Sequence, residues 1–313
     1  MPANQPAIIV RNLTKQFDSF TAVDKISFNV NYGEIFGFLG PNGSGKTTTI
    51  RMMLGLLQPT AGTVDVLDIS VNQGARELRP RVGYMSQRFS LYNDLTVLQN
   101  LQFYGRAYGL SDSKLESRIK DAIEMAGLTG NERTPTKDLS GGWRQRLALS
   151  ASILHRPEVV FLDEPTAGVD PISRRAFWDL IYEFVAEGIT VFITTHYMDE
   201  AEHCHRLAFL QRGQIIAYGS PEQIKRETMS GQVLEIAPSD AIKAIKILRA
   251  AQQSGKFPLE EVELYGSLVH VVAPKMTKLK HEIAAELSNA DISIDQMEII
   301  EPSLEDVFIA CMH

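Results

Sequence analysis

The chain has 313 residues, two cysteines and a formal net charge of −7, with 44% hydrophobic and 22% charged residues. The length favours two domains, and the acidic balance argues against a general nucleic-acid-binding surface. Two cysteines are too few for a disulfide scaffold, and no apolar run approaches the roughly 18 residues that a transmembrane helix needs. We therefore expect a soluble globular protein, which would serve a membrane process only by docking onto another protein.

The chain begins with two predicted strands, 7–17 and 22–30, which are rich in β-branched residues. Phe17 and Phe20, near the turn between them, are candidates for stacking on a flat base, because an aromatic face accepts any π-surface. Taken alone, each is more typical of a packing residue. The base-binding role and the packing role both stay open at this point.

A glycine-rich segment, 40–48, follows the apolar run 35–39 and leads into a helical pattern. The glycines let successive backbone N–H groups point at one centre, and the following helix adds the positive end of its dipole. Lys46 would hold β- and γ-phosphates, and the Thr47 hydroxyl would ligate Mg²⁺. The alternative, an ordinary glycine turn, is disfavoured by the flanking strand and helix. The predicted phosphate-binding residues are Gly40, Asn42, Gly43, Ser44, Gly45, Lys46, Thr47 and Thr48.

The region from about 91 to 156 is predicted to be a helical insert. A capping-box pattern at Thr96 starts a first helix, a second covers 113–126, and a third covers 144–155. Ser140, with Gly141 and Gly142, precedes the third helix. This start could bind an anion through its open N–H groups, or Ser140 could simply cap the helix.

The apolar run 159–162 is typical of a strand buried in a parallel sheet, and it ends in Asp163 and Glu164. Carboxylates at such a strand end lie where open α/β sheets bind ligands. Neighbouring strand residues point to opposite faces, so one acid can hold a metal while the other polarises a water. The alternative is that both acids solvate a turn. The next predicted strand, 189–195, ends in the same way at His196.

Residues 203–205, His-Cys-His, have the composition of a metal site. They fall in a predicted helix that starts at Met198, where residues i and i+2 face away from each other. We therefore do not expect zinc there.

The last part of the chain follows a β-α-β-β-α-β order, which is typical of a small ferredoxin-like α+β domain. It contains no glycine loop and no clustered acid–base set, which favours a regulatory or contact role. We predict an α/β nucleotide-binding domain over 1–228 and this second domain over 229–313. Its predicted strands are 232–236, 262–264, 268–272 and 292–300, and its predicted helices are 240–251, 277–288 and 303–311.

In combination, these motifs resemble the ATP-binding cassette (ABC) ATPases over roughly residues 7–230, with a P-loop NTPase fold of the ABC type. The motifs are the loop 40–48, the Leu-Ser-Gly-Gly segment 139–142, the acids Asp163 and Glu164, the segment 167–170 and His196. The tracts 164–171 and 301–308 further resemble the bacterial drug-export branch, the daunorubicin-resistance-like ATPases that energise a separate permease.

The resemblance implies a role for each motif residue. Phe17 would stack on adenine, and Lys46 with the backbone of 42–47 would hold the phosphates. Mg²⁺ would be ligated by Thr47 and Gln87, with Asp163 acting through water. Glu164 would be the general base, and His196 would contact the γ-phosphate. Ser140, Gly141 and Gly142 would reach the ATP of a second copy, and Asp170 would lie at the same interface.

The resemblance also implies the partners. We expect a homodimer closed by ATP, an integral membrane permease, a peripheral place on the cytoplasmic side of the cell membrane, and no nucleic acid. The exported compound would be drug-like or lipid-like. Trp143 stands where the family usually has Gln; it either alters the interface geometry or packs on the helical insert. The alternatives are a soluble ABC ATPase acting on ribosomes or nucleic acid, disfavoured by the acidic charge, and a non-catalytic scaffold, disfavoured by the presence of Lys46 and Glu164.

Overall fold

A computed structural model describes residues 5–87, 91–228 and 232–312. The chain divides into two compact units, Met1–Pro221 and Glu222–His313. The domain boundary expected at 228/229 adjoins residues 229–231, which lie outside the described residues.

The first unit is a mixture of strands and helices. In chain order they are β1 (Pro6–Phe17), β2 (Phe20–Asn31), β3 (Ile35–Leu39), α1 (Lys46–Met53), β4 (Ala61–Val66), β5 (Ile69–Ser70), α2 (Val71–Leu78), the 3₁₀ turn η1 (Arg79–Arg81), β6 (Val82–Met85), α3 (Val97–Ala107), α4 (Asp112–Met125), the 3₁₀ turn η2 (Thr136–Asp138), α5 (Gly141–Ile153), β7 (Val159–Asp163), α6 (Pro171–Ala186), β8 (Thr190–Thr195), α7 (Met198–Ala201), β9 (Arg206–Gln211), β10 (Gln214–Gly219) and α8 (Pro221–Thr228) at the junction.

A six-stranded sheet lies at the centre of this unit, in the order β10-β9-β3-β8-β7-β6. All neighbouring strands are parallel except the antiparallel edge pair β10–β9. Strands β3, β7 and β8 are buried along their whole length, as expected for strands covered on both faces. Because parallel strands end at the same edge, the segments that follow β3, β7 and β8 meet there.

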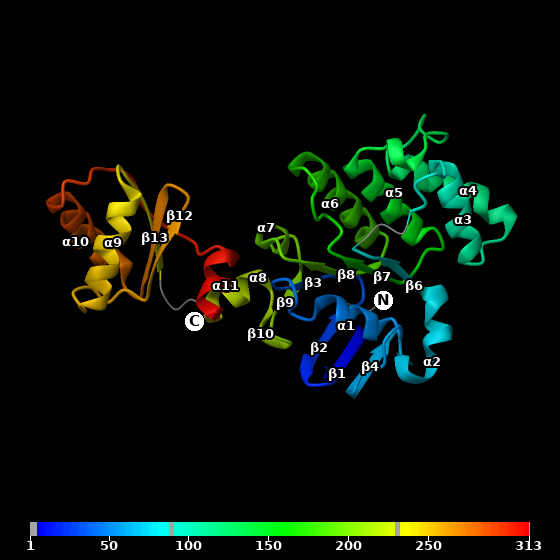
Figure 1. Cartoon of the computed structure of the whole chain (residues 1–313), viewed down its shortest axis with the longest axis horizontal. Helices are drawn as coiled ribbons and strands as arrows, with labels where there is room; N and C mark the ends of the chain where they lie inside the picture. The colour runs from blue at the N-terminus through cyan, green and yellow to red at the C-terminus, as the bar shows by residue number, and fades with distance from the viewer. Residues whose placement is uncertain (1–4, 88–90, 229–231, 313) are drawn as a thin grey trace. The chain divides into compact units, whose positions relative to one another are not determined.

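Two different layers cover the faces of this sheet (Figure 1). A four-stranded antiparallel sheet, β2-β1-β4-β5, packs with α1 on one face. Phenylalanines fill this core, and the ring centroids of Phe28, Phe36 and Phe192 lie 5.5 to 6.0 Å apart. Helices α3 to α6 build the core on the other face.

The helices expected within 91–156 are confirmed as α3, α4 and α5. Helix α3 begins at the predicted capping box, in which Thr96 and Gln99 bond each other's backbone. Trp143 packs against the helical core, with the Arg146 guanidinium 5.8 Å from its ring centroid. The packing role considered for Trp143 is therefore confirmed.

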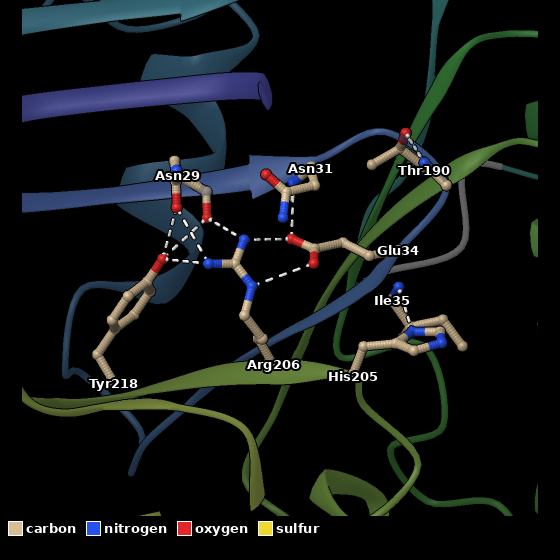
Figure 2. A network of polar contacts seen from close by, with 9 residues as sticks. Asn29, Asn31, Glu34, Ile35, Thr190, His205, Arg206 and Tyr218 are labelled. Atoms are coloured by element: carbon tan, nitrogen blue, oxygen red, sulfur yellow. Dashed lines mark hydrogen bonds and ion pairs between the residues drawn. The ribbon is translucent and has the colours of Figure 1, made fainter. Parts of the chain in front are cut away.

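A polar network joins the two sheets near the start of β3 (Figure 2). The Arg206 guanidinium pairs with both carboxylate oxygens of Glu34, at 2.7 and 3.1 Å. It also donates to the side-chain and backbone oxygens of Asn29 and to the Tyr218 hydroxyl. Burial tends to lower the pKa of Arg206, but the hydrogen bonds and charge of Glu34 raise it overall. The network thus keeps a half-buried charge fully paired.

The prediction that a helix runs from Met198 through residues 203–205 is wrong, because α7 ends at Ala201. The chain must leave the helix there to place β9 beside β3, where Phe36 pairs with Arg206. His205 Nδ1 accepts a hydrogen bond from the Ile35 N–H at 2.9 Å, and His203 Nδ1 lies 2.7 Å from the Tyr182 hydroxyl. In the described ranges no group of three or more His, Cys, Asp or Glu side chains could hold a metal ion.

The second unit shows the predicted β-α-β-β-α-β order, with a further C-terminal helix. Its sheet is antiparallel throughout, in the order β12-β13-β11-β14, and α9 and α10 pack on one face around an apolar core. This arrangement confirms the ferredoxin-like α+β fold. The elements are β11 (Gln232–Pro238), α9 (Ala241–Gln253), β12 (Glu261–Tyr265), β13 (Leu268–Ala273), α10 (Met276–Asn289), β14 (Ile294–Ile300) and α11 (Leu304–Met312).

Candidate functional site

A cleft of about 410 Å³ opens at the carboxyl ends of β3 and β7. It brings together most of the phosphate-binding residues expected from the sequence, with the two aromatic candidates, Phe17 and Phe20, 45% and 60% exposed. The lining residues are Phe17, Phe20, Ala22, Asn42, Gly43, Gly45, Lys46, Thr47, Thr48, Gln87 and Glu164.

The glycine loop is shaped by close backbone approaches. Gly45 has φ +111°, and a Cβ there would lie 2.5 Å from the Ala22 carbonyl oxygen, so no other residue fits without strain. Lys46 is the first residue of α1, and its Nζ donates to the carbonyl oxygens of Gly40 (2.7 Å) and Pro41 (3.2 Å). The loop therefore folds back over its own lysine and turns the start of α1 toward the cleft.

Three side chains converge on the Glu164 carboxylate, which is 7% exposed. Lys46 Nζ forms an ion pair with Oε1 at 3.0 Å, and Gln87 Nε2 donates to Oε2 at 3.0 Å. His196 Nδ1 lies 3.3 Å from Oε2 and has no hydrogen-bond partner within the described residues. The three side chains come from α1, from the segment after β6 and from the end of β8, and their N–H groups suit a phosphate oxygen.

Asp163, the last residue of β7, is fully buried. Its Oδ1 accepts hydrogen bonds from the hydroxyls of Thr47 (3.1 Å) and Thr194 (2.8 Å), whereas Oδ2 has no hydrogen-bond partner within the described residues. Burial raises the pKa of Asp163, although the bonds from Thr194 and Thr47 oppose the shift. A free carboxylate oxygen beside a hydroxyl is a donor set that fits Mg²⁺.

Thr194 is a positioning residue that the sequence analysis missed. Besides bonding Asp163, its hydroxyl accepts from the Glu164 N–H at 3.0 Å, and its carbonyl oxygen accepts from the same N–H at 3.1 Å. Glu164 has φ +47°, a left-handed conformation that a non-glycine residue adopts only when its surroundings fix it. The alignment of β7 with β8 could have identified Thr194, because Asp163 pairs with Thr194 in that register.

Eight of the predicted site residues are not among those that line the cleft. Gly40 and Ser44 belong to the glycine loop, Asp163 and His196 lie at strand ends, and the other four, Ser140, Gly141, Gly142 and Asp170, lie at the starts of α5 and α6. Ser140 caps α5, and a Cβ on Gly142 would come within 2.4 Å of the Ser173 hydroxyl, so the two helix starts pack closely. A Cβ added to Gly141 would have no other atom within 4 Å, so the space beside Gly141 is open. Asp170 caps α6 by accepting from the Ser173 N–H, which lowers its pKa.

Two family models match this chain. The ABC transporter model matches residues 23–167, and the model of the ATP-binding protein DrrA1-3-like C-terminal domain matches residues 219–312. Together they extend over both units of the structure.

Curated relatives match over most of this chain. The probable multidrug ABC transporter ATP-binding protein YbhF of Escherichia coli (strain K12) is 46% identical over 228 residues, which are 73% of this chain and 39% of YbhF. This chain thus spans about two fifths of the length of that relative. The Nod factor export ATP-binding protein I of Mesorhizobium japonicum is 33% identical over 309 residues, 98% of this chain and 87% of the relative.

Solved structures share the fold of the first unit. One is cbiO1 from Clostridium perfringens, described as part of the ABC transporter complex cbiONQ; its TM-score is 0.66 at 28% identity, over 72% of this chain and 92% of that one. Another is the ATP-binding cassette MJ0796, a dimeric post-hydrolysis state bound to ADP and Pi. Its TM-score is 0.62 at 26% identity, over 68% of this chain and 98% of that one.

None of the helices in the described ranges combines the length and the hydropathy that crossing a bilayer requires. The phosphate loop and Glu164 line the cleft, and Asp163 accepts a hydrogen bond from the lining residue Thr47. The similarity to a relative extends over almost the whole length of the chain. The chain belongs to the ABC transporter ATP-binding proteins, in the branch that carries the DrrA-like C-terminal domain.

Proposed function

We propose that this chain is the ATP-hydrolysing subunit of an exporter, and that two copies close around two MgATP to drive a separate membrane permease. The name of the Nod factor export relative supports the export direction, and the name of the multidrug transporter relative supports a drug-like compound. The exported compound would be drug-like or lipid-like. The subunit would lie on the cytoplasmic side of the cell membrane through the permease.

The cleft residues suit the parts of ATP in order. The exposed face of Phe17 would stack on adenine, with Phe20 beside it in the same cleft. The backbone of 42–47 and the Lys46 ammonium would hold the phosphates, which the start of α1 also favours. A purine nucleoside triphosphate thus has a matching group at each end.

Thr47, Asp163 and Gln87 are the residues that would hold Mg²⁺. When bound, the ion would neutralise charge on the phosphate oxygens. The unpartnered Asp163 Oδ2 and the adjacent Thr47 hydroxyl support this assignment, because both are hard oxygen ligands.

The convergence of Lys46, Gln87 and His196 on Glu164 is the observation that carries the proposal. When these three side chains turn to the terminal phosphate, the carboxylate is released from its ion pair with Lys46 and can accept a proton from the attacking water. His196 would then contact the γ-phosphate. Glu164 is thereby the general base of hydrolysis.

The second half of each site would come from the other copy. Ser140, Gly141 and Gly142 form a helix start that does not line the cleft of their own chain, and Asp170 caps the neighbouring helix start. A helix start with open N–H groups binds an anion, and the terminal phosphate of the partner's ATP is the anion proposed.

The Glu164→Gln variant tests this proposal. We expect it to bind ATP, to accumulate as an ATP-bound dimer, and to release phosphate about 10²–10⁴-fold more slowly, which is the usual contribution of a general base. Phosphate release and size-exclusion chromatography with the permease present are the measurements. Glu183→Gln, an exposed acid on α6, is the matched control. Unaltered turnover in Glu164→Gln would remove Glu164 from its role.

The partner is tested by affinity purification from solubilised membranes. We expect an integral membrane protein to copurify with the chain. Copurification of ribosomes or DNA in its place would contradict the exporter and favour the soluble alternative.

A further inference from the structure

A buried carboxylate outside the cleft joins two segments of the proposed catalytic site. Glu200 on α7 is 1% exposed, and Thr166, in the segment between Glu164 and Asp170, is also 1% exposed. The Thr166 hydroxyl donates a hydrogen bond to Glu200 Oε1. The segment after the proposed general base is therefore tied to the helix that follows His196.

Arg174 on α6 completes this cluster. Its Nε lies 3.5 Å from Glu200 Oε1, and its Nη1 pairs with Asp199 Oδ2 at 3.0 Å. The guanidinium also lies 4.3 Å from the ring centroid of Tyr197, the residue directly after His196. A buried carboxylate is costly in free energy unless it is paired. The contacts with Glu200 therefore fix the positions of Arg174 and Thr166 as well as that of Glu200.

The backbone of Glu164 explains why this anchor matters. Its left-handed conformation needs support from both sides of the residue. Thr194 holds the N–H of Glu164 on the side of β7, and Thr166 holds the chain two residues later. Without the second anchor the peptide after Glu164 can relax, and the carboxylate would then leave its position in the cleft.

The cluster also reaches the surface offered to the second copy. The backbone N–H of Arg174 donates to the Asp170 carbonyl oxygen at 2.9 Å, and Ser173 packs against Gly142. Arg174 thus lies in the first turn of α6, the helix whose start packs against the start of α5.

We infer that Glu200 is a positioning residue for ATP hydrolysis, which fixes the segment after Glu164 against the segment after His196. This inference rests on the proposed ATPase function. Glu200 does not line the cleft, so it acts on the placement of the general base and leaves nucleotide binding untouched.

The Glu200→Ala and Thr166→Val variants test this role. We expect each to lower kcat at least tenfold, while KM and the affinity for a non-hydrolysable ATP analogue stay within twofold of wild type. Thr166→Ser restores the hydroxyl and should restore kcat. The double variant should be no slower than the slower single variant, because both changes break the same contact. Glu183→Ala on α6 is the control.

The outcomes distinguish a failure of the positioning role of Glu200 from a failure of the proposed ATPase function. An active wild type with unchanged kcat in Glu200→Ala would overturn the positioning role alone. So would a parallel loss of kcat and analogue affinity that Thr166→Ser does not repair, since that pattern indicates a general structural defect. A wild type that releases no phosphate in the presence of its permease would overturn the proposed function, and this inference with it.

Discussion

Each unit of the molecule contains a buried carboxylate beside a histidine, and the two clusters behave differently. Glu164 in the first unit and Asp306 in the second are both 7% exposed. Glu164 lies against a cleft of about 410 Å³, and its partners come from a glycine loop and two strand ends. Asp306 belongs to the first turn of α11 and accepts from the N–H and hydroxyl of Ser303, whose hydroxyl in turn accepts from the Asp306 N–H.

The histidines show the same contrast. His270, 5% exposed, has Nδ1 3.1 Å from Asp306 and Nε2 3.1 Å from Glu235, so both ring nitrogens face carboxylates. It therefore ties β13 to β11 and to α11, and the Tyr265 ring stacks on it at 4.9 Å. His196 has one nitrogen near Glu164 and is 32% exposed at its side chain. A buried ionisable cluster thus indicates a ligand site only where a cleft lets the ligand replace a partner.

The sharpest test of this contrast is Lys46→Met, because it removes the cation from Glu164 and keeps the apolar stem. Hydrogen bonds to charged groups contribute about 1.5–3 kcal/mol, and about 1.4 kcal/mol is tenfold in an equilibrium constant. We therefore expect ATP to bind about 10- to 100-fold more weakly, as measured by equilibrium titration with a fluorescent ATP analogue.

Lys120→Met is the control for Lys46→Met, since Lys120 is exposed on α4 and does not line the cleft. Circular dichroism checks that both variants are folded. Wild-type ATP affinity in Lys46→Met would mean that the Lys46–Glu164 pair is as structural as the pair formed by His270 and Asp306.

A smaller effect, on stability, is expected for His270→Ala. The substitution leaves Asp306 and Glu235 without their shared partner, and an unsatisfied buried polar group costs about 1–3 kcal/mol. We expect the amides of β13 and α11 to lose about 2 kcal/mol of protection in hydrogen exchange of the full chain. His281→Ala, on the exposed side of α10, should change protection by less than about 0.5 kcal/mol. A loss of ATP hydrolysis in His270→Ala would contradict the structural role assigned to this cluster.

Local signals in the sequence predicted much of the fold and the cleft. The glycine loop, the buried strands ending in Asp163 and His196, and the capping box at Thr96 all depend on residues close together in the chain. The sequence also predicted the order of elements in the second unit, because each strand and helix there has its own periodicity.

The features that sequence analysis missed are contacts between segments far apart in the chain. Thr194 acts on Asp163 only through strand register, and Thr166 meets Glu200 only after α7 packs behind the site. The end of α7 was also missed, because the turn into β9 is set by pairing with β3. His270 gave no local signal, since its partners Glu235 and Asp306 lie 35 and 36 residues away.

The smallest expected effect is a pH dependence confined to the second unit. The hydrogen bond with Asp306 raises the pKa of His270 above 6.5, against the effect of burial, and Glu235 adds to the shift. The charged groups that face this ring are Asp306 of α11, Glu235 of β11 and Glu263 of β12, which pairs with His270 in the sheet. Burial tends to raise the pKa of Asp306, but the bonds with His270 and Ser303 lower it below 3.8.

The pH dependence of each contribution to stability follows from the direction of its pKa shift. The His270 contribution is fully present below pH 6.5, the unfolded value, and is lost as the pH rises through the higher folded pKa. The Asp306 contribution is present above pH 3.8 and is lost as the pH falls through the lower folded pKa.

The difference in protection between wild type and His270→Ala should therefore be largest between these values and shrink at higher pH. Part of the protection difference of about 2 kcal/mol should remain at high pH, because Tyr265 still stacks on the neutral His270 ring. An NMR titration of the His270 ring with a midpoint at or below 6.5, or a difference independent of pH, would show that the ring does not bridge two carboxylates as a cation.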